Sequence, residues 1–146
     1  MEKKYRAEAI FNKQKDIYNP YFQTRIVLNS DSLHHLQFSA RRERDKNEQL
    51  LKFSLLPLAL EIIKKSGTIQ EYRKILTTFG SKGKDGLLKT KVVEYWGMVA
   101  IVGENRIKIK VILKRIGNGN IIFWSVMPYS KLKNQRLVDG DDIVNE

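Results

Sequence analysis

The chain has 146 residues, with 27 Lys and Arg against 16 Asp and Glu, which gives a formal net charge of +11 at pH 7. It contains no cysteine, which excludes disulfide frameworks, thiolate metal sites and cysteine nucleophiles. Hydrophobic residues make up 42% of the chain, enough for a packed core. The cationic excess favours RNA, DNA, an anionic membrane surface or an acidic protein as the partner.

The first half of the chain is expected to be mainly helical. An N-terminal arm or helix over 1–20 ends at a turn marked by Asn19-Pro20 and is followed by a short strand, 24–28. Polar residues over 29–32 can cap a first helix that continues through the charged stretch 41–48. Three further expectations are an apolar helical segment over 49–65, a kink or the start of a new helix at Pro57, and a short helix over 68–78.

The second half is expected to be a sheet. Residues 79–91 carry glycines and lysines without periodicity and predict a mobile basic loop. Three strand-like segments follow, Val92–Val102, Arg106–Ile116 and Ile121–Met127, with an Asn-Gly hairpin turn before the last. The sequence therefore predicts an α+β fold in which N-terminal helices pack on one face of a C-terminal antiparallel meander of three to four strands. A single domain over 1–146 is expected, with its core at 24–130 and a polar tail at 131–146.

The middle strand of this meander has two chemically different sides. Its apolar residues alternate with lysines, and successive strand side chains point to opposite faces. The apolar set is Ile107, Ile109, Val111 and Leu113, and the cationic set is Lys108, Lys110 and Lys114. Together with Arg115, these lysines predict a face that neutralises phosphates. The alternative is a face charged for solubility or for guarding an edge strand.

Two adjacent histidines lie near the start of the first helix. At helical spacing His35 shares a face with Ser39 and Arg42, whereas His34 aligns with Phe38 and Arg41. An imidazole can move a proton near neutral pH and a guanidinium can hold two phosphate oxygens, so His35 and Arg42 form a candidate phosphate site. Alternatively, these histidines only cap or pack. A metal site is not expected, because adjacent helical residues diverge and no partner has ligand spacing.

Ser125 is the polar member of an otherwise apolar last strand. It either lines the site and donates to a phosphate oxygen or is a small residue tolerated beside a helix. Three aromatic residues could stack on nucleobases, a contact worth about 1–3 kcal/mol per base. They are Tyr95, Trp96 and Tyr129.

The order of these elements resembles the barnase–EndoU–colicin–RelE superfamily of ribonuclease domains, especially its phage and mobile-element branch. The segment Ile26–Leu36, with its His-His pair, is similar to the segment that carries a catalytic histidine in that branch. The closing segment Phe123–Pro128 is similar to the family's strand that ends in a hydroxyl residue and a proline. The resemblance covers roughly 24–130 and implies that His35, or His34 one position away, and Ser125 belong to the active site.

The chain departs from this branch at one point. The branch often has a second histidine about a turn and a half after the first, where this chain has Ala40, Arg41 and Arg42. Arginine stabilises phosphate but stays protonated and cannot shuttle a proton at pH 7. If two proton carriers are needed, the second is His34, Glu94, Tyr95 or another residue.

The leading hypothesis is a metal-independent, toxin-like endoribonuclease that needs no cofactor. In it the RNA 2′-hydroxyl attacks the adjacent phosphorus and leaves a 2′,3′-cyclic phosphate. His35 would transfer the proton, Ser125 would hydrogen-bond a phosphate oxygen, and Arg42, Lys110 and Lys114 would stabilise charge. His34, Arg41, Lys108, Arg115 and Tyr95 are the further candidate nucleic-acid contacts.

Two rival hypotheses are a non-catalytic nucleic-acid-binding accessory protein of a phage or mobile element, and a module that pairs with an acidic protein. RNA is the expected partner, with transfer RNA among the candidates, and an acidic antitoxin or immunity protein is a second. A membrane partner is not expected, because the longest apolar stretch, 53–63, is short and carries Glu61. A cytoplasmic location is expected.

Overall fold

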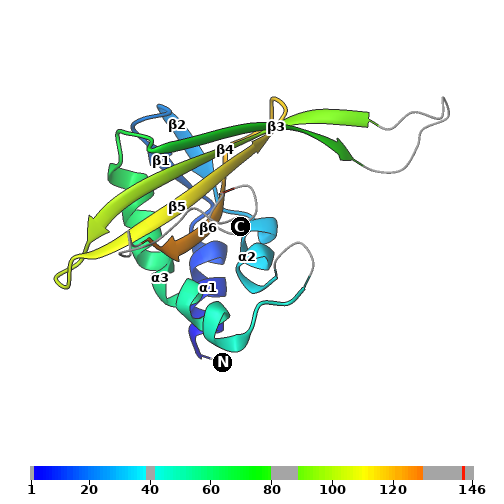
Figure 1. Ribbon diagram of the computed structural model, residues 1–146. Helices are drawn as coiled ribbons and strands as arrows, with labels where there is room; N and C mark the ends of the chain where they lie inside the picture. Colours follow the sequence, from blue (N-terminus) through cyan, green and yellow to red (C-terminus); the bar gives the residue numbers. More distant parts are fainter. Residues whose placement is uncertain (1, 39–41, 80–88, 130–142, 144–146) are drawn as a thin grey trace, which may run out of the picture.

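The computed structural model describes residues 2–38, 42–79, 89–129 and 143, which form an α+β fold (Figure 1). The helices are α1 (Glu2–Lys13), α2 (Ser30–Gln37) and α3 (Lys46–Lys65). The strands are β1 (Asp16–Asn19), β2 (Thr24–Val27), β3 (Glu71–Phe79), β4 (Lys89–Val102), β5 (Ile107–Ile116) and β6 (Ile122–Pro128). The predicted α+β class is therefore confirmed.

The sheet is larger and more mixed than the predicted meander. Its strand order is β1-β2-β6-β5-β4-β3, and all neighbouring strands are antiparallel except β2 and β6, which meet in parallel at Val27 and Ile122. The prediction of three to four antiparallel strands preceded by all the helices was wrong, because β1 and β2 come before α2 and join the same sheet. β2 confirms the short strand predicted at 24–28, whereas β1 lies in the segment 1–20 that was expected to be an arm or helix.

Residues 71–79 form strand β3 instead of the predicted helix. β3 pairs with β4 along its whole length, from Glu71 opposite Gly97 to Phe79 opposite Lys89. Thr68 and Glu71 have the spacing of a helix-capping pair, but the continuous ladder to β4 satisfies the backbone groups of the segment instead. Figure 1 shows β3 and β4 extending well past the helices as a long ribbon.

The predicted first helix is interrupted after one short segment. α2 starts at Asn29, whose side chain accepts a hydrogen bond from the Ser32 amide at 3.0 Å. It ends at Gln37, and Phe38 then forms an isolated bridge with Glu43. The reversal places the Arg44 amide 2.8 Å from the Gln37 carbonyl. Arg42 therefore does not continue the helical face of His35 as predicted.

The second predicted helix is confirmed as α3. Asp45 caps it by accepting from the Glu48 amide at 2.8 Å, and the helix runs through Pro57 without interruption. At the other end of the helix, the side-chain amide of the buried Asn19 donates to the backbone carbonyl groups of Ile63 and Ser66, at 2.7 and 3.1 Å. Asn19 therefore ties β1 to the C-terminal end of α3.

The two faces of the sheet are both partly apolar. On the helix face, side chains of β4, β5 and β6 form the main core against α1 and α3; for example, the rings of Phe11 and Phe123 lie 6.2 Å apart. On the opposite face, here called the outer face, Val93, Tyr95 and Ile112 form a second buried cluster, which Ile143 covers. The outer face is therefore not the uniformly cationic surface that the lysine alternation predicted.

Three predicted features lie outside the described residues. They are Arg41, most of the basic loop at 79–91, and the polar tail at 131–146 except Ile143. Within the described part of the chain, none of the helices is both long and apolar enough to cross a membrane.

Candidate nucleic-acid interface

His35 lies where the C-terminal end of α2 packs against β6. Only 7% of the residue is exposed, and its ring stacks on Trp124 with the centroids 4.0 Å apart and 17° between the planes. Arg44, which is 4% exposed, donates from Nε to the His35 carbonyl oxygen at 3.0 Å. The predicted catalytic histidine is therefore packed between an indole and a guanidinium rather than presented on an open helix surface.

The contact between Arg44 and the imidazole fixes the histidine tautomer. Arg44 Nη2 lies 3.2 Å from His35 Nε2, and a guanidinium has donors but no acceptor. Nε2 must therefore accept, which leaves the ring proton on Nδ1. Glu48 holds Arg44 in place through a 2.7 Å hydrogen bond from Nη1, and the same carboxylate lies 4.0 Å from Arg42. Glu48 and Arg44 thus connect His35 to Arg42.

Lys114 reaches the same indole from β5. Its ammonium nitrogen lies 3.8 Å from the Trp124 ring centroid and 5.6 Å from that of Tyr95, which stands opposite Lys114 on β4. Burial lowers the pKa of Lys114, and the attraction of Asp31 on α2 partly opposes this shift. His35, Lys114 and Tyr95, three of the predicted site residues, therefore gather around Trp124.

Ser125 is fully buried and engaged with a lysine that the sequence reading did not select. Lys52 of α3 donates to the Ser125 hydroxyl at 3.0 Å and to the Val126 carbonyl at 2.9 Å. The contact joins α3 to β6. A lysine on the apolar stripe of α3, one turn before Leu56, was the sequence signal that could have identified this contact.

The other two outer-face lysines surround Tyr129. The ammonium groups of Lys108 and Lys110 lie 5.2 and 4.6 Å from its ring centroid. Lys110 is only 3% exposed and forms a 2.6 Å ion pair with Glu71 of β3. The pair crosses β4 near Gly97, where an added Cβ would come within 3.2 Å of the Glu71 Cβ. Glu71 had been assigned to a helix, so its role on this face was missed.

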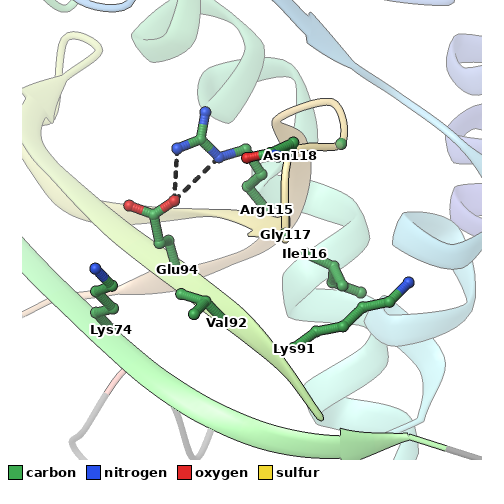
Figure 2. A pocket seen from close by; sticks show the side chains of 9 residues that line it. Lys74, Lys91, Val92, Glu94, Arg115, Ile116, Gly117 and Asn118 are labelled. Atoms are coloured by element: carbon green, nitrogen blue, oxygen red, sulfur yellow. Dashed lines mark hydrogen bonds and ion pairs between the residues drawn. The ribbon is translucent and has the colours of Figure 1, made fainter. Parts of the chain in front are cut away.

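Arg115 points to the helix face, away from the outer-face lysines. There it donates from Nε to Glu94 at 3.0 Å, beside a pocket of about 800 Å³ that Lys74 also lines (Figure 2). His34 is exposed and stacks on Phe38, with 4.5 Å between the ring centroids. The structure therefore separates Arg115 and His34 from the group around Trp124.

Ile143 covers part of the outer face. It is 1% exposed and packs with Val93, Tyr95 and Ile112, while Trp124 and Met127 border this cluster. The predicted stacking residue Tyr95 is consequently 7% exposed. The aromatic surface beside Lys114 is in contact with the chain's own C-terminal region.

The described residues contain no group of three or more His, Asp or Glu side chains arranged to hold a metal ion. Comparisons with protein-family models, curated proteins and solved structures give no match to this chain. The interpretation of the interface therefore depends on its geometry and on the sequence pattern.

Proposed function

We propose that the chain binds RNA on its outer face and cleaves it without a metal, as a toxin-like endoribonuclease that leaves a 2′,3′-cyclic phosphate. The supporting observation is the meeting of His35 and Lys114 on Trp124, because it brings α2, β5 and β6 together at one point. An imidazole, an ammonium group and aromatic rings are suited to proton transfer, charge stabilisation and base stacking, respectively.

In this proposal each of these groups has a distinct role. Lys114, which is half-buried and has a lowered pKa, stabilises negative charge on the phosphorane oxygens. His35 commits Nε2 to Arg44, so any proton that it transfers moves through Nδ1. Ser125 accepts from Lys52, which polarises its hydroxyl group for donation to a phosphate oxygen.

The second candidate function is RNA binding without cleavage. The burial of His35 and Ser125 specifically favours it, because a catalytic group must come within hydrogen-bond distance of the substrate. In this case Lys108, Lys114 and Tyr129 provide affinity, while His35, Arg44, Lys52 and Ser125 only hold α2 and α3 against β6.

Incubation of total RNA with the protein in EDTA distinguishes the two candidates. Fragments with cyclic phosphate ends support cleavage, and intact but retarded RNA supports binding alone. RNA that is neither cleaved nor retarded contradicts both. Co-purification with an acidic protein would identify a partner that competes for the outer face.

A set of four variants tests the site itself. His35→Ala and Lys114→Gln should abolish cleavage or reduce it at least about a hundredfold, in line with the loss of acid–base or electrostatic help. His35→Phe keeps a ring against Trp124 and separates loss of proton transfer from loss of packing. Lys64→Gln, an equal charge change on an exposed position of α3, is the control and should leave cleavage unchanged. Full cleavage by folded His35→Phe would remove His35 from the mechanism.

A further inference from the structure

A second concave region lies on the helix face, where β3 and β4 leave the body of the protein. Two adjoining pockets share Glu94 and together form what we call the neck groove. One pocket, of about 800 Å³, is lined by Lys74, Arg115 and the turn that contains Gly117 and Gly119. The other, of about 530 Å³, is lined by aromatic residues, namely Tyr21, Tyr72 and Trp96. The groove is therefore cationic at one end and aromatic at the other.

A ladder of polar contacts joins the two ends. The Tyr72 hydroxyl donates to Glu94 at 2.6 Å, and Arg115 donates to the other carboxylate oxygen at 3.0 Å. Lys74 stands directly opposite Glu94 on β3, and the Arg115 guanidinium lies 5.6 Å from the Trp96 ring centroid. Burial acts to raise the pKa of Glu94, but the hydrogen bonds from Tyr72 and Arg115 and the nearby cations lower it overall.

The charges in the groove leave one positive charge in excess. The Glu94 carboxylate is negative, and the Lys74 and Arg115 side chains are positive. Glu71 also lines the aromatic pocket, but its charge is neutralised by the ion pair with Lys110. Figure 2 shows Lys74 and Arg115 on either side of Glu94, whereas the Lys91 side chain points away from it. A single excess positive charge matches the single negative charge of a phosphodiester group.

The aromatic end offers an exposed ring at a suitable distance. Tyr72 is 43% exposed and lies 5.8 Å from Trp96, which also packs edge-on against Phe22. Two residues along a strand span about 7 Å, so Glu94, which both pockets share, and Trp96, which lines the aromatic one, are about 7 Å apart along β4. The ring of Tyr72 is therefore placed to stack on a base whose phosphate lies at Arg115 and Lys74.

We propose that the neck groove binds one nucleotide unit, with its phosphate at Arg115 and Lys74 and its base against Tyr72. The inference rests on RNA as the partner but not on cleavage, because none of these residues belongs to the group around Trp124. The groove and the outer face lie on opposite sides of the sheet. A strand that occupies both must therefore pass around the sheet.

The two tryptophans report on the two sites separately. Trp96 lines the neck groove and Trp124 lies on the outer face, and the chain has no other tryptophan. We would titrate the protein with adenosine 5′-monophosphate and with a 2′-O-methylated tetra-adenylate, which cannot be cleaved, and follow both indole N–H signals and the Gly117 and Gly119 amide signals by NMR.

A saturable shift of Trp96, Gly117 and Gly119 with either ligand supports the neck groove. A shift with the mononucleotide shows a site for free nucleotides, and a shift with the oligonucleotide alone shows a site for a strand. A response of Trp124 alone overturns this inference and leaves the proposed function standing. No response from either tryptophan overturns both.

Variants provide the second test. Tyr72→Leu should weaken binding at the groove about tenfold, because base stacking is lost, whereas Tyr72→Phe should bind nearly as well. Lys74→Glu should weaken binding by a similar factor, and Lys64→Glu is the control with the same charge change on α3. If Tyr72→Leu and Lys74→Glu each bound as tightly as the wild type, the ladder of polar contacts would only stabilise the β3–β4 ribbon.

Discussion

Arg44 joins the buried His35 to the partly exposed carboxylate of Glu48. It contacts the His35 carbonyl, the His35 ring and the Glu48 carboxylate, and 4% of the residue is exposed. We expect Arg44→Ala to lower the free energy of unfolding by about 3 kcal/mol, because buried hydrogen-bonding groups lose their charged donor. Urea denaturation followed by circular dichroism measures this change.

The control for that measurement is an exposed ion pair. Arg25 lies 2.7 Å from Asp16, but its side chain is 64% exposed. We expect Arg25→Ala to change the free energy of unfolding by less than about 1 kcal/mol. An equal effect of the two substitutions would mean that Arg44 is solvated like a surface residue.

The charged Lys114 side chain is predicted to lower the free energy of unfolding, because it is partly buried. Burial lowers the pKa of Lys114 from its usual 10.5, so in the window between the lowered and the usual values the unfolded chain holds more protons. Stability should therefore rise with pH across that window, and the penalty should be full at neutral pH. We expect Lys114→Met to be at least as stable as the wild type at neutral pH. Its free energy of unfolding should not show this increase with pH.

Denaturation of both proteins at neutral and alkaline pH tests this expectation. A Lys114→Met protein that is less stable at every pH would show that the contact of the ammonium group with Trp124 outweighs the cost of its burial.

At the level of elements, α3 contains Pro57, a residue that is disfavoured in the interior of a helix. Pro57 is exposed and lies inside an unbroken helix, where it removes the amide that would donate to the Phe53 carbonyl. In a helix interior, proline lowers the free energy of unfolding by about 3 kcal/mol relative to alanine. About 1 kcal/mol of this loss is offset, because proline also restricts the unfolded chain. We expect Pro57→Ala to raise the free energy of unfolding by about 1–2 kcal/mol.

Thermal unfolding of the two proteins measures the effect. A lower melting temperature for Pro57→Ala would indicate that a bend at Pro57 is needed for the packing of α3 against the sheet.

The elements that the sequence predicted well are those with long, regular patterns. The β4–β6 meander follows from strict alternation and from Asn-Gly, and α3 follows from its apolar pattern over 49–65. Its start at Lys46 lies in the stretch that was predicted to belong to the first helix. β3 was misassigned because Thr68 and Glu71 imitate a helix start, while its pairing with β4 is a tertiary interaction. β1 was missed because it closely follows α1 and falls within the predicted N-terminal arm, whereas the strand predicted at 24–28 is confirmed as β2.

For the whole molecule, the outer-face lysines should contribute unequally to RNA binding. Lys114 pairs with no carboxylate among the described residues at ion-pair distance, whereas Lys110 is engaged with Glu71 at 2.6 Å. Neutralising one phosphate of single-stranded RNA changes the slope of log K against log salt by about 0.7. We expect Lys114→Gln to reduce that slope by about this amount and Lys110→Gln to reduce it less.

Binding titrations at several salt concentrations measure the slopes. Equal slopes for Lys114→Gln and the wild type would exclude Lys114 from phosphate contact. A large loss of slope in Lys110→Gln would mean that the Glu71 pair opens when RNA binds.

The candidate interface could be predicted only in part. The alternation in β5 identified Lys108, Lys110 and Lys114, and the structure does place them on the face opposite the main core. Arg44 and Glu71 could not be identified, because their partners are 9 and 39 residues away in the chain and meet them only in the folded state. Lys52 could be recognised as a lysine on the apolar stripe of α3, but its partner, 73 residues away, could not. Sequence patterns report which way a side chain points but not what it meets.

The parallel contact between β2 and β6 has a consequence for how the protein is made. Val27 leaves the ribosome long before Ile122, its partner in the sheet. β1 and β2 therefore cannot join the rest of the sheet until β6 has been synthesised. His35 and Trp124 are likewise apart until β6 has been synthesised. A nascent chain therefore cannot assemble the interface around Trp124, and any activity that resides there begins only after β6 has been synthesised.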